Sequence, residues 1–198
     1  MLQILPSARQ MRLSASAHAA LAPEMAPDTA VRELLARGLA QDALPLALRL
    51  LPRPYAVAWL CQCMRAQTLN DHDSEGLRLA QAWVQQPGHA QRESARAFAA
   101  EDDYQSVGAW LAAAAAWSDG SLSEQDGPPV PEHLTAAAAV AALLHLAATR
   151  GKLMELNALL RGNADTSFME TGPPPPVDVR FVLTLDSDTR LLRNSVSA

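Results

Sequence analysis

The fold is decided by an alanine-rich stretch in the second half of the chain. It reads WLAAAAAW (residues 110–117), then a polar and proline-rich crossing, SDGSLSEQDGPPVP (residues 118–131), then EHLTAAAAVAALLHLAATR (residues 132–150). Alanine has the lowest helix cost of any residue, so both flanking runs are predicted to be helical without help from their neighbours. Segments this apolar, with no clear polar face, are buried on most sides. We therefore expect these two helices to form the centre of an all-α core.

Shorter helices are predicted on both sides of this centre. Apolar spacing, capping residues and breakers give helices over residues 28–37, 41–51 and 55–67, a fourth between Ser74 and Pro87, and further helices over 89–100 and 152–161. Pro45 is placed in the first turn of its helix, where proline is tolerated. Short connections make neighbouring helices antiparallel, so a compact multi-helix bundle and an irregular helical-hairpin stack both remain open.

Buried positions follow from the helical spacing of large apolar residues. Tyr55, Trp59 and Cys63 lie four residues apart and are predicted to face the core. The side chains expected to be largely buried are Trp59, Leu60, Leu77, Trp83, Trp110, Leu111, Leu143 and Leu144.

Four segments are predicted from changes in composition. Residues 1–27 are a poorly ordered N-terminal segment, 28–161 the helical domain, 162–176 a proline-rich linker and 177–198 a strand-like docking tail. In the tail, apolar residues alternate with mostly polar ones, a period that indicates a β-strand or hairpin: Val177, Val179, Phe181, Leu183 and Leu185. A lone strand is marginal in water, so it must pack on the helices, pair with another copy of the chain or add to a partner's sheet.

The composition excludes several classes of partner. Hydrophobic residues make up 49% of the chain, charged residues 19%, and the net charge is -5. This balance gives no general affinity for nucleic acid or anionic membranes. Apolar runs are too short to span a bilayer. Cys61 and Cys63 point to different helix faces and should not pair, which favours a reducing, cytoplasmic location.

Catalytic signatures are weak. The five histidines show none of the spacings used by helical metal sites, and phosphate loops, nucleophile elbows and HExxH motifs are missing. We therefore predict no catalytic, cofactor or metal residues. The alternative is a small hydrolase or metal-dependent enzyme using His133 or His145.

Two stretches look familiar. LPRPYAVAWLC (residues 51–61), and AWSDGSL (residues 116–122) followed by PPVPEHLT (residues 128–135), resemble a family of uncharacterised bacterial helical proteins sometimes encoded near type VI secretion components and effectors. The resemblance covers about residues 28–160 and implies a cytoplasmic accessory protein. It brings no catalytic residues with it.

The leading hypothesis is a non-enzymatic interaction module, an adaptor or chaperone that holds a secreted effector or a secretion component. Its partner-binding residues are expected to be Trp117 and the apolar face of the tail, and the tail strand also allows a homo-oligomer. An immunity protein that blocks a toxin is the other non-enzymatic reading, because an acidic chain suits a basic partner.

Overall fold

The computed structural model describes residues 3–121 and 127–160, with side chains as far as Arg150. In these ranges every regular element is a helix: α1 (Ile4–Gln10), α2 (Ala15–Ala20), α3 (Pro27–Ala36), α4 (Ala40–Leu50), α5 (Arg53–Arg65), α6 (Asp71–Gln85), α7 (His89–Glu101), α8 (Val107–Ala116) and α9 (Leu134–Leu160). One isolated β-bridge joins Ser121 to Pro129. The predicted all-α class is confirmed for these residues. The proposed linker and docking tail lie outside them.

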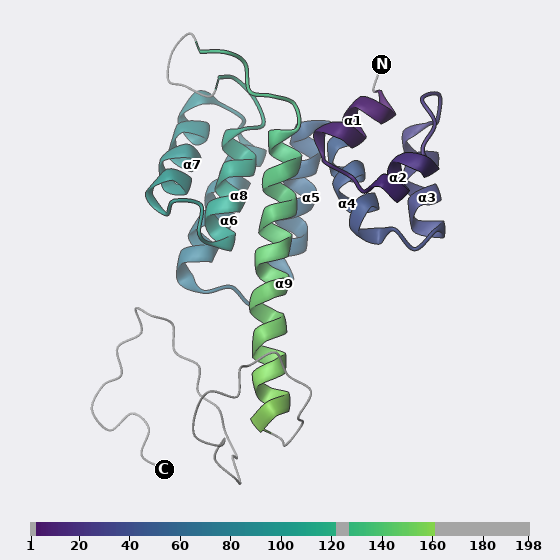
Figure 1. Cartoon of the computed structure of the whole chain (residues 1–198). Helices are drawn as coiled ribbons and strands as arrows, with labels where there is room; N and C mark the ends of the chain where they lie inside the picture. Colours follow the sequence, from purple (N-terminus) through teal and green to yellow (C-terminus); the bar gives the residue numbers. More distant parts are fainter. Residues whose placement is uncertain (1–2, 122–126, 161–198) are drawn as a thin grey trace, which may run out of the picture. The chain divides into compact units, whose positions relative to one another are not determined.

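Two hydrophobic cores fill the first of the two compact units into which the chain divides, residues 1–147. The larger core is built around α8, in which every residue except Trp110 is buried. Helices α6 and α7 pack beside α8, and the alanines at the start of α9 are buried in the same core (Figure 1). The predicted central position of the alanine-rich helices is therefore confirmed.

Helices α6 and α8 approach each other closely at two glycines. A Cβ atom added to Gly76 would lie 2.2 Å from the carbonyl oxygen of Gly108, so the two backbones are in direct contact. Beside this contact the buried Asp73 carboxylate accepts a hydrogen bond from Gly108 N at 2.6 Å. The carboxylate thereby satisfies a free N–H in the first turn of α8 and complements its positive end.

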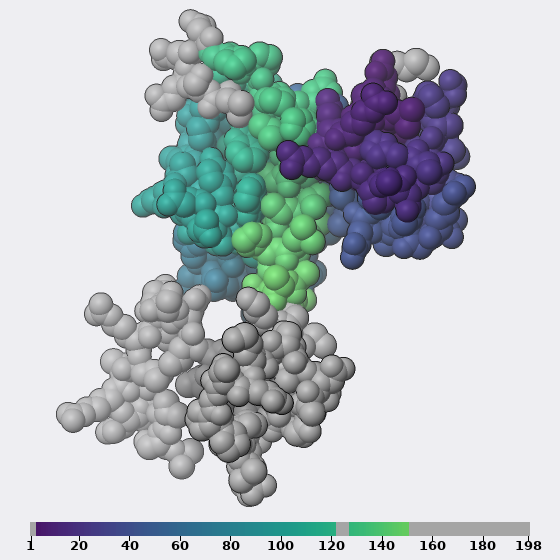
Figure 2. All heavy atoms as spheres, in the orientation of Figure 1, coloured from purple at the N-terminus to yellow at the C-terminus, as the bar shows by residue number. Residues whose placement is uncertain are grey.

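The smaller core contains α1 to α4, and here the structure differs from the weak order expected before Pro27. Apolar side chains of the first segment are buried against α3 and α4: Ile4, Ala8, Leu13, Ala17, Ala20 and Leu21. Ser14 caps α2, and Asp42 of α4 accepts hydrogen bonds from its amide and hydroxyl groups at 2.7 and 2.8 Å. Figure 2 shows this region as one packed body. The segment lacks strong helical periodicity in its sequence. It is ordered because its apolar side chains pack in one core with those of α3 and α4.

The face of α5 differs from the prediction. Its buried residues are Ala56, Val57, Leu60, Cys61 and Met64, whereas Tyr55 is 69% and Trp59 38% exposed. Leu144 on α9, predicted to be buried, is 64% exposed. The other expected core residues are buried or half-buried against the larger core. Helix α5 packs this buried side against α6 and α8, and the two aromatic rings lie on the other side of the helix.

Two predicted helix details are wrong. The separate helix over residues 152–161 does not exist, because α9 continues without a break through Gly151 to Leu160. A single glycine costs a helix about 1 kcal/mol, which is too little to end it. Pro45 is the sixth residue of α4 and lies beyond its first turn. The helix accommodates the lost backbone hydrogen bond because its apolar face is buried.

Candidate functional site

Arginine side chains from three other helices hold the loop between α8 and α9. Arg53 of α5 donates to the carbonyl oxygens of Ser118 and Val130 at 3.5 and 3.3 Å. Arg96 of α7 donates to the carbonyl oxygen of Ser121 at 2.6 Å. These bonds reach both arms of the loop, residues 118–121 and 127–131. Its described arms are thus fixed against the helices.

Arg49 of α4 secures the end of the same loop. Its guanidinium is 9% exposed and pairs with the carboxylate of Glu132, just before α9. Its Nε donates to Gln10 Oε1 of α1 at 2.9 Å. A buried charge needs partners of this kind to offset its lost hydration. One side chain therefore connects α1, α4 and the start of α9.

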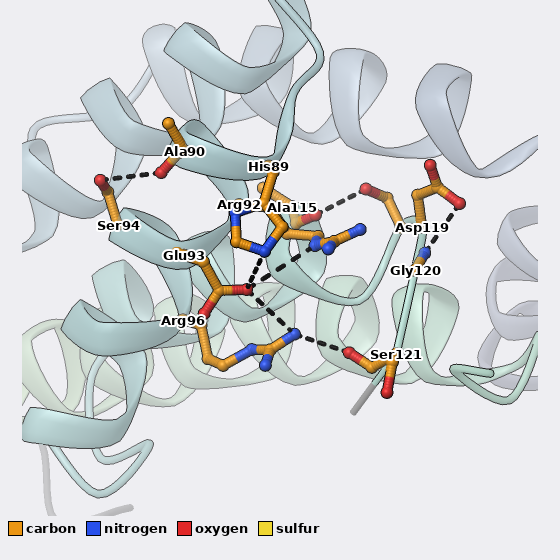
Figure 3. Close-up of polar contacts among 11 residues, drawn as sticks. His89, Ala90, Arg92, Glu93, Ser94, Arg96, Ala115, Asp119, Gly120 and Ser121 are labelled. Atoms are coloured by element: carbon orange, nitrogen blue, oxygen red, sulfur yellow. Dashed lines mark hydrogen bonds and ion pairs between the residues drawn. The ribbon is translucent and has the colours of Figure 1, made fainter. Parts of the chain in front are cut away.

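Figure 3 shows how the arginines of α7 are arranged beside the loop. The Glu93 carboxylate lies between two guanidinium groups, 4.0 Å from Arg92 Nε and 3.5 Å from Arg96 Nη2. His89 Nε2 is 3.9 Å from the same carboxylate oxygen. Glu93 offsets part of the positive charge, and the carbonyl oxygen of Ser121 accepts a hydrogen bond from Arg96. This network is a structural clamp.

Gly120 fits this clamp for two reasons. Its φ of +74° is a conformation that side chains disfavour, and a Cβ atom there would lie 1.9 Å from Arg92 Nη1. The carbonyl oxygen of Gly120 accepts a hydrogen bond from Val130 N at 2.9 Å, which joins the two arms. Thr135 Oγ1 then donates to the carbonyl oxygen of Trp117 at 2.8 Å. The familiar Trp-Ser-Asp-Gly-Ser and Pro-Pro-Val-Pro-Glu motifs are therefore the two sides of a clamped loop.

Trp117, predicted to bind a partner, is half-buried in an aromatic cluster. Its ring is stacked with Tyr104 at a centroid distance of 5.6 Å and lies edge-on to Trp110 at 6.3 Å. Tyr104 lies 5.5 Å from Trp110, and His145 of α9 lies 6.3 Å from the same ring. These separations are those of rings in direct contact. The cluster joins α8 to α9. The other predicted partner-binding residues, Val177 to Leu185, lie outside the described residues.

The two histidines of the enzyme alternative are not brought together. His133 immediately precedes α9, and His145 lies twelve positions further along the same helix, so about 18 Å of helix separates them. His145 belongs to the aromatic cluster. No group of three or more histidine, cysteine or acidic side chains suited to a metal ion occurs in the described part of the chain.

The thiols are less reactive than free cysteine. Burial raises the pKa of Cys61 to about 11, and burial also raises the pKa of Cys63 above its ordinary value. A thiol reacts as the thiolate, so a raised pKa makes a catalytic or metal-binding role for this pair less favourable. Both cysteines are free thiols in the structure.

The outer face of α5 carries two exposed aromatic side chains. Tyr55 and Trp59 lie one turn apart on it, and Gln62 and Arg65 continue the same face towards the end of the helix. Arg53, at the start of α5, holds the clamped loop. These contacts place the clamped loop at the N-terminal end of α5.

The sequence matches the model of a family of unknown function, DUF6931, over residues 30–164. The chain belongs to this family. Family membership confirms that the helical part resembles an uncharacterised family, and the matched residues include α5, the clamped loop and its arginines.

The chain is also similar to a short part of one much longer protein. It is 58% identical over 48 residues to the cyclic beta-(1,2)-glucan synthase NdvB of Rhizobium meliloti (strain 1021). The match covers 24% of this chain and 2% of the synthase. No solved structure matches the chain.

Sequence reasoning missed the clamping arginines, although one signal was available. Arg49 interrupts an apolar run, Leu46 to Leu51. A charge in such a run is buried only with a partner, which pointed to a distant carboxylate. Arg92 and Arg96 gave no such signal, because a polar helix face is normally solvated.

Proposed function

We propose that this protein is a non-enzymatic interaction module that binds a protein partner through its helical domain. The observation that carries the proposal is the outer face of α5, where Tyr55 and Trp59 are exposed on a helix anchored by its opposite face. Tyrosine and tryptophan provide most of the energy at many protein interfaces. A rigid helix also presents them with little loss of conformational entropy on binding.

The biological setting is proposed from the family resemblance. Members encoded near type VI secretion components suggest a cytoplasmic adaptor or chaperone for a secreted effector or a secretion component. An immunity protein that blocks a toxin is the related alternative, supported by the net charge of -5, which suits a basic partner. Co-expression with each neighbouring gene product distinguishes them, because only an immunity protein restores growth when a toxin is expressed.

A pull-down from the native host tests the α5 face. Wild type should retain a stoichiometric protein partner, and a Tyr55→Ser and Trp59→Ser double variant should lose it. The matched control is Leu35→Ser on α3, which replaces another exposed apolar residue, 53% exposed. Absence of a stoichiometric partner, or equal capture by the double variant, would reject this use of α5.

The tail remains a second proposed binding segment, through Val177, Val179, Phe181, Leu183 and Leu185. Ending the chain at Gly172 should leave helicity and thermal stability nearly unchanged while weakening self-association or partner binding. Unfolding or precipitation of the shortened chain, with a monomeric full-length form, would show that the segment belongs to the protein's own core.

A further inference from the structure

We propose that Arg92 and Arg96 of α7 bind a phosphate group beside the clamped loop. The inference goes beyond the proposed function, because it does not involve the face of α5. Figure 3 shows both guanidinium groups directed from α7 towards the loop arm of residues 118–121. The two residues lie four positions apart and so share one side of the helix. Their side chains are 14% and 16% exposed, which withdraws most of each cation from water.

Arg92 differs from the other arginines beside the loop in its hydrogen bonds. Its guanidinium has five N–H donors, yet it donates to no group in the described part of the chain, and its Nε is buried without a partner. Arg49, which is buried to a similar extent, pairs with Glu132 and donates to Gln10. Buried polar groups are nearly always hydrogen-bonded, so the donors of Arg92 require a water molecule or an ion.

The charge of this cluster favours an anion over water. The Glu93 carboxylate is shared by both arginines, at 3.5 Å from Arg96 Nη2 and 4.0 Å from Arg92 Nε. His89 Nε2 lies 3.9 Å from the same oxygen. Asp119 of the loop arm accepts a hydrogen bond from the neighbouring backbone N–H at 2.7 Å. One carboxylate therefore faces two largely buried cations, and a bound anion would offset the remaining positive charge as water cannot.

The geometry of the two side chains suits a phosphate group. Guanidinium groups bind phosphate through paired, charge-assisted hydrogen bonds, and a terminal phosphate has three oxygens with which to meet two of them. Gly120 leaves the terminal nitrogens of Arg92 uncovered, because a Cβ atom there would lie 1.9 Å from Nη1 and 2.7 Å from Nη2. The low exposure of both side chains suits one small group rather than an extended polyanion, which the net charge of -5 would also repel.

Thermal unfolding of the full-length chain in inorganic phosphate tests the proposal. At pH 7 and constant ionic strength, millimolar phosphate in place of chloride should raise the unfolding temperature of wild type, because a ligand of the folded state stabilises it. Phosphate also stabilises proteins generally by exclusion from their surfaces, so the shift is compared among variants. Arg92→Ala should bind phosphate about tenfold or more weakly and lose the specific part of the shift.

Two further variants act as controls. Arg78→Ala removes an exposed arginine that is already paired with Glu75, and it should keep the wild-type shift. Arg92→Lys keeps the charge without the paired donors and should bind phosphate more weakly than wild type. Circular dichroism in chloride checks folding, and if Arg92→Ala does not fold, Arg92→Lys decides the question. The absence of a shift in wild type, or shifts of equal size in wild type and both Arg92 variants, would overturn the proposal.

The choice of ligand identifies what supplies the phosphate group. Phosphoserine that binds more tightly than inorganic phosphate would indicate a phosphorylated protein, and weaker binding would indicate free phosphate. Acetate is the third ligand, since it has the oxygens and charge of a carboxylate. If acetate at the same ionic strength stabilises wild type as strongly as phosphate, the arginines do not select phosphate and the proposal is rejected.

A last variant separates a bound phosphate from carboxylates of the loop itself. Glu124 and Asp126 belong to the loop and lie outside the described residues. The Glu124→Gln and Asp126→Asn double variant should show a phosphate shift at least as large as that of wild type. If the shift occurs only in this double variant, the loop's own carboxylates occupy the arginines, which would rule out a phosphate ligand in the natural chain.

Discussion

Cys61 and Cys63 illustrate how burial controls chemistry at the scale of one residue. They are separated by one position on α5, yet Cys61 is buried and Cys63 is half-buried, because residues two apart on a helix point in different directions. Burial disfavours the charged thiolate and raises the pKa of Cys61 to about 11 from its ordinary value of 9.0.

This pKa predicts a loss of stability at high pH. Between about pH 9 and pH 11 the unfolded chain releases the Cys61 proton while the folded chain retains it, so the free energy of unfolding falls as the pH rises. Below pH 9 both states keep the proton and this contribution is fully present. The loss should approach about 1.4 kcal/mol per pH unit inside the window. Urea titrations of wild type and Cys61→Ala check it, since the variant should lack this part of the slope. Parallel pH profiles would contradict the assignment.

Two glycines with the same backbone conformation allow a matched test of the loop clamp. Gly38 and Gly120 both have φ of +74°, but a Cβ atom on Gly38 would meet nothing within 4 Å, whereas one on Gly120 would displace Arg92. Gly38→Ala should cost about 1 kcal/mol from the backbone alone. Gly120→Ala should cost more, because the Arg92 guanidinium must also move.

A double-mutant cycle isolates this additional cost. In an Arg92→Ala background the cost of Gly120→Ala should fall to that of Gly38→Ala, measured as the free energy of unfolding in urea. Additive effects of the two substitutions would show that Arg92 does not pack on Gly120.

At the scale of elements, the contact between α6 and α8 leaves no room for a side chain at Gly76. At Gly76 the obstructing atoms belong to the backbone of α8, which cannot rotate away as a side chain can. Gly76→Ala should therefore cost about 3 kcal/mol or more, beyond the usual range for a small overpacking change. Gly88→Ala is the control, because the near atom there is the side-chain oxygen of Gln91, and its cost should stay below about 1 kcal/mol. Similar unfolding midpoints for both variants would rule out a close backbone contact.

At the scale of the whole molecule, the N-terminal helices stabilise the core formed with α3 and α4. Removing residues 1–22 would expose the apolar faces that α1 and α2 cover. Each large buried side chain contributes about 1.5–3 kcal/mol, and the segment buries Ile4, Leu13 and Leu21. The deletion should lower stability by at least about 3 kcal/mol, with α3 and α4 protected least in hydrogen exchange. Unchanged stability would show that the segment is dispensable.

The sequence by itself determined the helical class, most helix positions and the central place of the alanine-rich helices. These features depend on local signals, chiefly low helix cost and an apolar period of 3.6 residues.

The tertiary structure decided the features that depend on contacts between distant segments. Helix α5 carries apolar residues on two sides, and periodicity alone could not tell which side is buried. Packing of α5 against α6 and α8 buries the side that carries Val57, Leu60 and Met64 and leaves Tyr55 and Trp59 outside. Likewise, only the fold brings Arg49, Arg53 and Arg96 to one loop. The groups that they contact there, carbonyl oxygens and the Glu132 carboxylate, lie 25 to 83 positions away and leave no trace in the local sequence around each arginine.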